Sequence, residues 1–178
     1  MKKLIVLSIV LCANLFAYTH DDVINDYKEG KYKSVCLKSA IFYKNAEKDE
    51  KILSIIGDAC AKVDYINPLG YIVRKLVSTP EFRENSSYFA TLILQKKLIY
   101  QFMNDNIDLK NLRLPRSNHT LSIVFENLAK KNYTKKQDKI IINLDNKEYR
   151  VWLSNAKKRV VNIEEYIDGK KIKTHWYL

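Results

Sequence analysis

The chain has 178 residues, with 31 Lys and Arg against 20 Asp and Glu and a formal net charge of +11. That length excludes a large multidomain protein and predicts one domain, or one domain with a small appendage. Only 4 Gly and 3 Pro occur, and no Gly-, Pro- or Ser-rich stretch interrupts the chain, which excludes a flexible linker between two units.

Residues 1–17 have the composition of a secretory signal peptide. Lys2 and Lys3 supply a positive start, residues 4–11 are almost all apolar, and the small residue Ala17 precedes a polar stretch. The apolar run is shorter than the roughly 20 residues that a membrane-spanning helix needs. The sequence therefore predicts export, cleavage near Ala17, and a mature protein in the periplasm or secreted from the cell.

Cys12 lies at the end of this apolar run and raises the alternative of a lipid-anchored protein. A lipoprotein signal needs a small residue immediately before the cysteine, whereas Leu11 is large. The cleaved form is therefore the interpretation that we favour, with a retained membrane anchor as the alternative.

Cleavage leaves two cysteines, Cys36 and Cys60. The periplasm is oxidising, so we expect the two thiols to form a disulfide that closes a loop of about 25 residues. Two buried, unpaired thiols are the alternative. No Cys-x-x-Cys motif is present, which argues against a redox enzyme. The three histidines have no ligand spacing relative to a cysteine, so we expect no metal site and no cofactor.

Residues 18–132 are predicted to be helical. The sequence Tyr27-x-x-Gly30-x-Tyr32 is typical of a helix end, a glycine turn and a new helix start. Apolar residues recur at helical spacing along the rest of this part. Helices are expected over residues 35–43, 52–63, 85–103 and 121–131, the last with Asn118 or Thr120 as its N-cap.

Residues 20–83 resemble tetratricopeptide repeats, which are helical hairpins of 34 residues. In that family a glycine is frequent in the turn and again at the eighth position of the first helix. If Gly30 is the turn glycine, the next repeat begins at Glu50 and Gly57 occupies its eighth position. The resemblance implies antiparallel helices packed in series, with the predicted disulfide joining two neighbouring hairpins, and a concave surface for a partner protein. A plain helical bundle is the alternative.

Residues 133–178 are predicted to form a four-stranded antiparallel β-meander, because the apolar period changes from 3.6 to 2. Asp168-Gly169 is the strongest hairpin signal in the chain. In the last strand we expect the alternating residues Ile172, Thr174, Trp176 and Leu178 to face the core. The predicted fold class is therefore α+β, with N-terminal helical hairpins of the tetratricopeptide-like solenoid type followed by a small antiparallel sheet.

Positive charge concentrates in the predicted meander. From Lys130 to Leu178 there are 13 Lys and Arg against 6 Asp and Glu. The outward faces are expected to carry basic groups interleaved with aromatic rings, namely Arg150, Trp152, Lys171, Lys173, His175 and Tyr177. Such a surface can bind an anionic polymer, a membrane surface or a partner protein, and a solvated sheet face is the plain alternative. We expect no nucleic acid outside the cytoplasm.

No catalytic motif is recognisable, because the sequence has no Gly-x-Ser-x-Gly elbow, His-Glu-x-x-His helix or Gly-rich phosphate loop. His119 is interpreted as a loop residue, and Glu164 and Glu165 lie on opposite faces of a predicted strand. We therefore expect a non-enzymatic periplasmic adaptor or scaffold that binds a partner protein in a cell-envelope assembly, without a small-molecule substrate. A part of a flagellar motor, a pilus or a secretion machinery is a concrete form of this hypothesis. The alternatives are a polyanion- or cell-wall-binding module and a small hydrolase.

Overall fold

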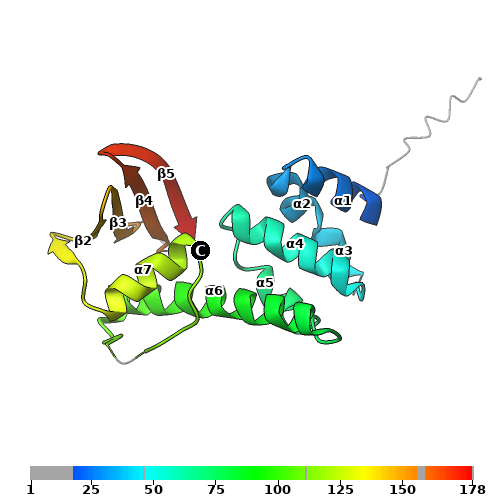
Figure 1. Cartoon of the computed structure of the whole chain (residues 1–178), viewed down its shortest axis with the longest axis horizontal. Helices are drawn as coiled ribbons and strands as arrows, with labels where there is room; N and C mark the ends of the chain where they lie inside the picture. The colour runs from blue at the N-terminus through cyan, green and yellow to red at the C-terminus, as the bar shows by residue number, and fades with distance from the viewer. Residues whose placement is uncertain (1–17, 46, 111, 156–158, 178) are drawn as a thin grey trace, which may run out of the picture.

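The computed structural model describes residues 18–45, 47–110, 112–155 and 159–177. The predicted signal peptide, its cleavage site near Ala17 and the anchor candidate Cys12 lie outside these described residues. The helices of residues 20–72 gather at one end of the molecule, and the β-sheet lies at the other end beside the helix of residues 120–129 (Figure 1). One long helix, residues 80–105, runs along both ends. The fold class is α+β, as predicted.

Capping side chains set the starts of the longer helices. Thr19 and Asp22 cap the first helix reciprocally, Asp49 caps the fourth, and Thr79 caps the sixth, where Pro80 occupies the first turn. Each cap binds backbone N–H groups that have no partner within the helix. In chain order the helices are α1 (His20–Lys28), α2 (Tyr32–Lys38), α3 (Ala40–Lys44), α4 (Glu50–Lys62), α5 (Leu69–Ile72), α6 (Pro80–Asp105) and α7 (Thr120–Ala129).

Helices α1 and α2 form a hairpin that packs against α4. Gly30 lies in the turn with a φ of +74°, a left-handed conformation that glycine adopts without steric cost, and the predicted turn is therefore confirmed. Val35 of α2 and Ile56 of α4 are fully buried in the resulting core. The predicted disulfide is also present, since Cys36 and Cys60 join α2 to α4 with their Cα atoms 4.9 Å apart.

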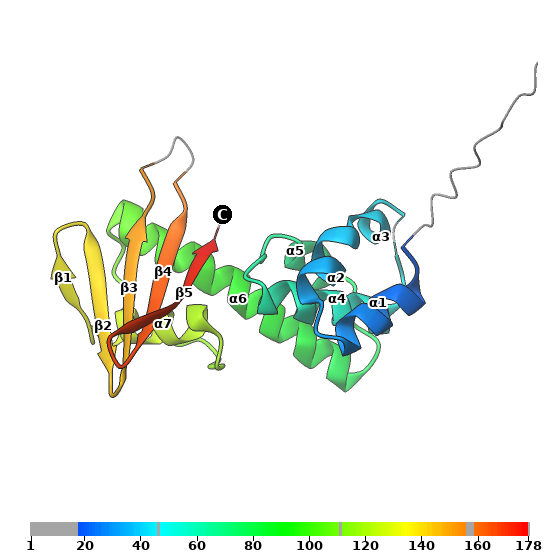
Figure 2. The same ribbon diagram turned by 90° about the horizontal axis from the view of Figure 1, so that it is seen from above.

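Helix α6 is shared by the two ends of the molecule. Its first turns contact α4 and α5, and its later turns contact α7 and two strands of the sheet (Figure 2). Its buried side chains lie in the middle of the helix, from Phe89 and Leu92 to Ile99. Within the described part of the chain, no helix is both long enough and apolar enough to cross a membrane.

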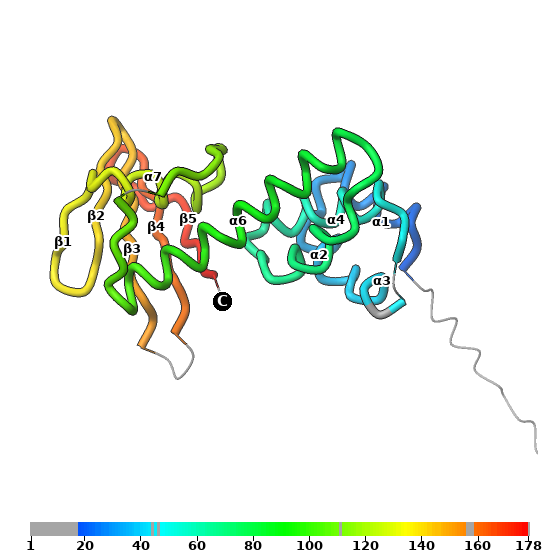
Figure 3. Tube along the Cα trace, turned by 90° about the horizontal axis from the view of Figure 1, so that it is seen from below, coloured from blue at the N-terminus to red at the C-terminus, as the bar shows by residue number. Residues whose placement is uncertain are grey.

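The sheet is an antiparallel meander in which each strand pairs with the next in sequence. Its strands are β1 (Thr134–Lys136), β2 (Lys139–Leu144), β3 (Lys147–Leu153), β4 (Val161–Ile167) and β5 (Lys170–Tyr177). One face of the sheet lies toward α6 and α7, and the other is open (Figure 3). The meander has five strands, where the sequence predicted four. The additional strand β1 is short, polar and exposed, so its residues show no apolar alternation.

The predicted orientation of β5 is wrong. Lys173 pairs with Glu165 and Lys171 with Tyr166, so Ile172 is an extra residue that bulges from the strand. After this bulge His175 and Tyr177 face inward and are buried, whereas the side chains expected in the core are exposed, 58% for Ile172 and 59% for Trp176. Thr174 is exposed as well, and Leu178 lies outside the described residues.

The disulfide should be present in protein isolated from the cell, and we expect unreduced peptide mass spectrometry to show Cys36 joined to Cys60. Replacing both cysteines by Ala should lower the free energy of unfolding by about 3 kcal/mol, because the bond constrains the unfolded chain over a loop of about 25 residues. Chemical denaturation of the double variant and of reduced wild-type protein provides the measurement and its control. Free thiols at both positions in the isolated protein would contradict the assignment.

Gly57 should resist even a single added methyl group. A Cβ atom at this position would overlap Cε2 of Phe89 and would lie 2.7 Å from its Cζ, and the Phe89 ring is buried on α6. Gly57→Ala should therefore destabilise the protein, because overpacking costs about 1–3 kcal/mol and exceeds the roughly 1 kcal/mol that Ala gains in helix propensity.

Thermal unfolding of Gly57→Ala, Phe89→Leu and the double variant measures this contact. We expect the double variant to lose less free energy of unfolding than the two single variants lose together, since Leu leaves room for the added methyl group. A higher melting temperature for Gly57→Ala than for wild type would show that the two helices are not in close contact.

Candidate functional site between the helices and the sheet

The turn that ends α4 brings an acidic side chain to the sheet. Asp64 has a φ of +64°, a conformation in which glycine is usual and Asp is tolerated. Its N–H donates to the carbonyl of Ala61 over 3.1 Å, and the N–H of Tyr65 donates to that of Cys60 over 2.9 Å. This is the hydrogen-bond pattern of a Schellman helix end, which fixes the direction in which the Asp64 carboxylate points.

Three donors from β5 bind that carboxylate. His175 Nδ1 lies 3.0 Å from each oxygen, the hydroxyl of Tyr177 donates over 2.8 Å, and Lys173 Nζ lies 2.9 Å away. The Asp64 side chain is only 11% exposed. Burial alone would raise the pKa of Asp64. The hydrogen bond and charge of His175 and the hydrogen bonds from Lys173 and Tyr177 outweigh burial and lower the pKa to about 2.

The far edge of the His175 ring faces two more polar groups. His175 Nε2 lies 3.4 Å from the hydroxyl oxygen of Thr120 and 3.6 Å from a carboxylate oxygen of Glu165. Glu165 also accepts hydrogen bonds from Lys147 and from the hydroxyl of Tyr149, both over 3.2 Å. The buried imidazole is therefore held between two carboxylates, each of which is also bound by a lysine.

His119 is the N-cap of α7, where the sequence predicted a loop residue with Asn118 or Thr120 as the cap. Its Nδ1 accepts the N–H of Leu121 over 3.2 Å, and its Nε2 lies 3.1 Å from the carbonyl oxygen of Ala61. These partners assign the proton to Nε2 of a neutral ring. Burial lowers the pKa of His119, which favours the same neutral form. His119 thus joins α7 to the end of α4, beside Asp64.

The order of Thr120 hydroxyl, His175 imidazole and Asp64 carboxylate resembles the order of groups in a hydrolase triad. Thr120 lies in the first turn of α7 and is only 9% exposed. Its hydroxyl oxygen lies 3.4 Å from His175 Nε2, and both side chains are buried in the contact between α7 and β5. Within the described residues, no group of three or more His, Cys, Asp or Glu side chains is arranged to hold a metal ion. The cluster is therefore interpreted as a structural junction.

The six residues of the predicted basic surface do not share one face. Lys173, His175 and Tyr177 lie on the inner face and bind Asp64. Arg150, Trp152 and Lys171 lie on the outer face. Each of these three side chains already has a partner on that face. Arg150 binds Glu148 over 2.6 Å and stacks on Tyr166. Lys171 binds Glu164 over 3.1 Å, and Lys139 lies over the ring of Trp152.

Sequence reasoning missed Asp64 because a lone Asp after a helix carries no motif.

The junction also creates a groove of about 300 Å³ where α2, the turn after α4 and the end of β5 meet. Figure 1 shows the end of β5 facing the end of α4. Three large apolar side chains that line the groove are exposed to solvent, Leu37 by 52%, Tyr65 by 38% and Trp176 by 59%. These residues are far apart in sequence, so only the folded junction brings them together.

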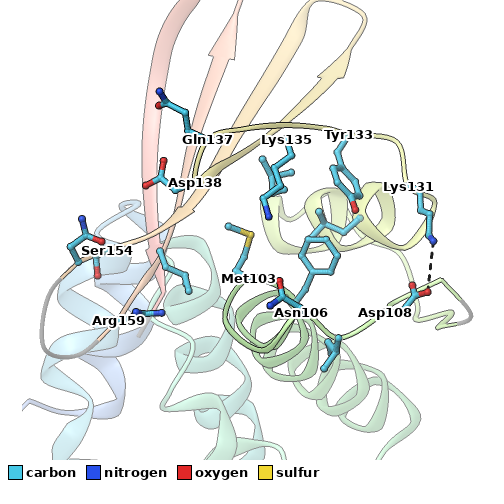
Figure 4. Close-up of a pocket in the computed structure, with 16 residues that line it drawn as sticks. Met103, Asn106, Asp108, Lys131, Tyr133, Lys135, Gln137, Asp138, Ser154 and Arg159 are labelled. Carbon is cyan, nitrogen blue, oxygen red and sulfur yellow. Dashed lines mark ion pairs between the residues drawn. The ribbon is translucent and has the colours of Figure 1, made fainter.

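A second cavity, of about 580 Å³, lies at the C-terminal end of α6 under the β1–β2 hairpin (Figure 4). Met103 and Tyr133 contribute to its apolar wall, and its lining also includes charged residues of both signs. Lys131 pairs there with Asp108 over 3.7 Å. The mixed charges select no particular ligand.

Comparisons with known proteins give no relative for this chain, since no family model, no curated protein and no solved structure matches it. The resemblance of residues 20–83 to tetratricopeptide repeats therefore stays a prediction.

The low pKa of Asp64 predicts a specific pH dependence of stability. A folded-state pKa of about 2, below the unfolded value near 3.9, means that the stabilisation is present above about pH 4 and is lost as the pH falls toward 2. Asp64→Asn keeps the side-chain shape and the tolerance of positive φ, but it removes the charge. We expect the wild type to exceed this variant in unfolding free energy at pH 6, and the difference to shrink by about 2 kcal/mol between about pH 5 and pH 2.

Chemical denaturation across this pH range measures the difference. Asp168→Asn is a matched control, because Asp168 also has a positive φ, of +49°, but is exposed and forms no ion pair within the described part of the chain. A wild-type advantage over Asp64→Asn that stays constant from pH 5 to pH 2 would contradict the assigned ion pairs.

Proposed function

We propose that this protein is a non-enzymatic adaptor or scaffold of the cell envelope, which binds a partner protein in the groove lined by Leu37, Tyr65 and Trp176. The observation that carries the proposal is the exposure of these three side chains around one cavity. Tyr and Trp are enriched among the residues that dominate binding energy at protein interfaces, because they bury a large area with few rotatable bonds.

Charge defines the kind of segment that fits the groove. Lys31, the N-cap of α2, and Lys38 at the end of α2 both pair with Asp26. Lys33, which lines the groove, forms no ion pair within the described residues. Among the described residues of the lining, Asp64 is the one acid, and three donors from β5 bind its carboxylate. The surface offered is therefore apolar with a positive edge, which favours a partner segment with an apolar anchor beside an acidic residue.

The sequence and the disulfide together support the proposed compartment. Disulfides persist in oxidising compartments, and residues 1–17 have the pattern of a signal peptide, so the proposed place of action is the periplasm. Stacked helical hairpins commonly bind proteins through extended surfaces. A flagellar motor, a pilus or a secretion machinery remains the concrete form of assembly that we propose.

Polyanion binding by the outer face of the sheet has less support. Of its three predicted contact residues, Arg150 and Lys171 are already bound by Glu148 and Glu164. An anionic polymer would have to displace these carboxylates before it gained the same interactions.

Site-specific crosslinking tests the proposed docking site. A photoactivatable residue in place of Leu37 should crosslink one partner in intact cells, and mass spectrometry should identify that partner. The matched control places the same residue at Leu94, an apolar residue of α6 with 43% exposure that does not line the groove. Equal crosslinking of the same partner from both positions would contradict docking in the groove.

Affinity for the purified partner then provides the decisive measurement. Leu37→Ala and Trp176→Ala should each weaken binding by about tenfold or more, as expected for side chains that contribute over about 1.4 kcal/mol at an interface. Leu94→Ala should leave the affinity unchanged, and all three variants should keep the wild-type melting temperature within a few degrees. Unchanged affinity of Trp176→Ala would exclude the groove as the binding surface.

A further inference from the structure

A third cavity, of about 730 Å³, lies between α6, α7 and the loop that connects them. Gln95 of α6 and Ser122 of α7 form its polar base, and Leu114, Pro115 and Phe125 contribute apolar wall. Figure 1 shows the connecting segment passing beside both helices. The volume is within the range of about 300–1,000 Å³ that is usual for small-molecule sites.

The base of this cavity has unused hydrogen-bonding capacity. Gln95 is 1% exposed, and its Nε2 donates to the carbonyl oxygen of Pro115 over 3.3 Å and to Ser122 Oγ over 3.2 Å. Because the Pro115 carbonyl can only accept a hydrogen bond, the side-chain nitrogen of Gln95, and not its oxygen, has to face Pro115. Gln95 Oε1 then accepts no hydrogen bond from the described residues, although a buried amide oxygen is costly to leave without a donor.

Ser122 adds a donor beside that acceptor. Its Oγ accepts the N–H of Ser117 over 2.9 Å as well as that of Gln95, and Ser122 is 3% exposed. Within the described part of the chain its own O–H donates to no acceptor. A ligand group that both donates and accepts, as a hydroxyl does, would satisfy Gln95 Oε1 and Ser122 together.

The lining of the cavity is strongly positive. Among the described residues it carries the exposed cations Lys110, Arg113, Arg116 and Lys130 and one acid, Glu126. Arg116 and Lys130 both pair with Glu126, whereas Lys110 and Arg113 form no ion pair within the described residues. A cavity with one sign of charge at its opening concentrates ligands of the opposite sign.

We propose that this cavity binds an acidic saccharide, whose hydroxyl groups contact Gln95 and Ser122 and whose carboxylate or phosphate contacts Lys110 and Arg113. Sugar hydroxyls supply the required donors and acceptors, and the C–H faces of the ring match the apolar wall formed by Leu114 and Phe125. This binding is separate from the adaptor function, because it uses none of the residues of the groove.

Calorimetric titration of the mature protein, residues 18–178, tests the proposal with four probes. Trigalacturonate carries carboxylates, glucose 6-phosphate carries a phosphate, maltotriose is neutral, and inorganic phosphate carries charge without a sugar. We expect one of the two acidic sugars to bind about tenfold tighter than both maltotriose and inorganic phosphate, since a hydrogen bond to a charged group is worth a factor of this order. Which acidic sugar binds tighter assigns the acidic group.

Variants then connect the affinity to the cavity. Gln95→Leu should weaken binding of the acidic sugar by about fivefold, through loss of one neutral hydrogen bond. Lys110→Gln with Arg113→Gln should weaken it by about tenfold or more and reduce its salt dependence. Lys51→Gln with Lys97→Gln is the matched control, because these exposed lysines lie outside the cavity, and it should bind as wild type does.

Three results would overturn the proposal. The acidic sugars and maltotriose bind with equal affinity, or inorganic phosphate binds as tightly as the sugars, or the control variant loses as much affinity as Lys110→Gln with Arg113→Gln. If Gln95→Leu fails to fold, the comparison of the two double variants still decides, since all four of their residues are exposed.

Discussion

The carboxylate of Asp64 is the constraint on which the arrangement of this protein depends. It extends from the end of α4 and binds His175, Tyr177 and Lys173 of the edge strand β5. The disulfide is close by, because Cys60 lies on the last turns of α4 and its carbonyl accepts the N–H of Tyr65. The end of α4 is thus tied on one side to α2 by a covalent bond and on the other to the sheet by charge. The groove between α2 and β5 is lined by residues of α2, of the turn after α4 and of β5, which are the segments that these two ties join.

A buried ion pair that joins two parts of a protein carries a large desolvation cost. Removing a carboxylate from water costs several kcal/mol, and an apolar contact of the same size often stabilises as well or better. Asp64 also occupies a backbone conformation that favours glycine. What the carboxylate adds is direction, because three donors converge on two oxygens and fix how β5 meets the helix. We interpret the Asp64 cluster as the contact that fixes β5 relative to α4. The exposed side chains of Leu37, Tyr65 and Trp176 form the surface that results from this arrangement.

Local sequence patterns predict much of this fold. The change of apolar period near residue 133 predicts the change from helices to strands, and Gly30 predicts the first turn. Two cysteines in a chain that is predicted to be exported predict the disulfide. The orientation of β5 could not be predicted this way. Alternation places Ile172 and Trp176 inside, but a bulge shifts the strand by one residue, and the inner face then carries the polar partners of Asp64. Because Asp64 and His175 are 111 positions apart, no local pattern relates them.

Residual dipolar couplings of backbone amides test most directly whether Asp64 sets the position of the sheet. In the wild type, amides of α1, α2 and α4 and amides of β2–β5 should fit one alignment tensor, because α6 and the Asp64 cluster hold both ends of the molecule rigidly. In Asp64→Ala each group should still fit well by itself, but the two tensors should differ in orientation or magnitude. A single tensor that fits both groups equally well in wild type and in Asp64→Ala would contradict the account and assign the positioning of the sheet to α6 alone.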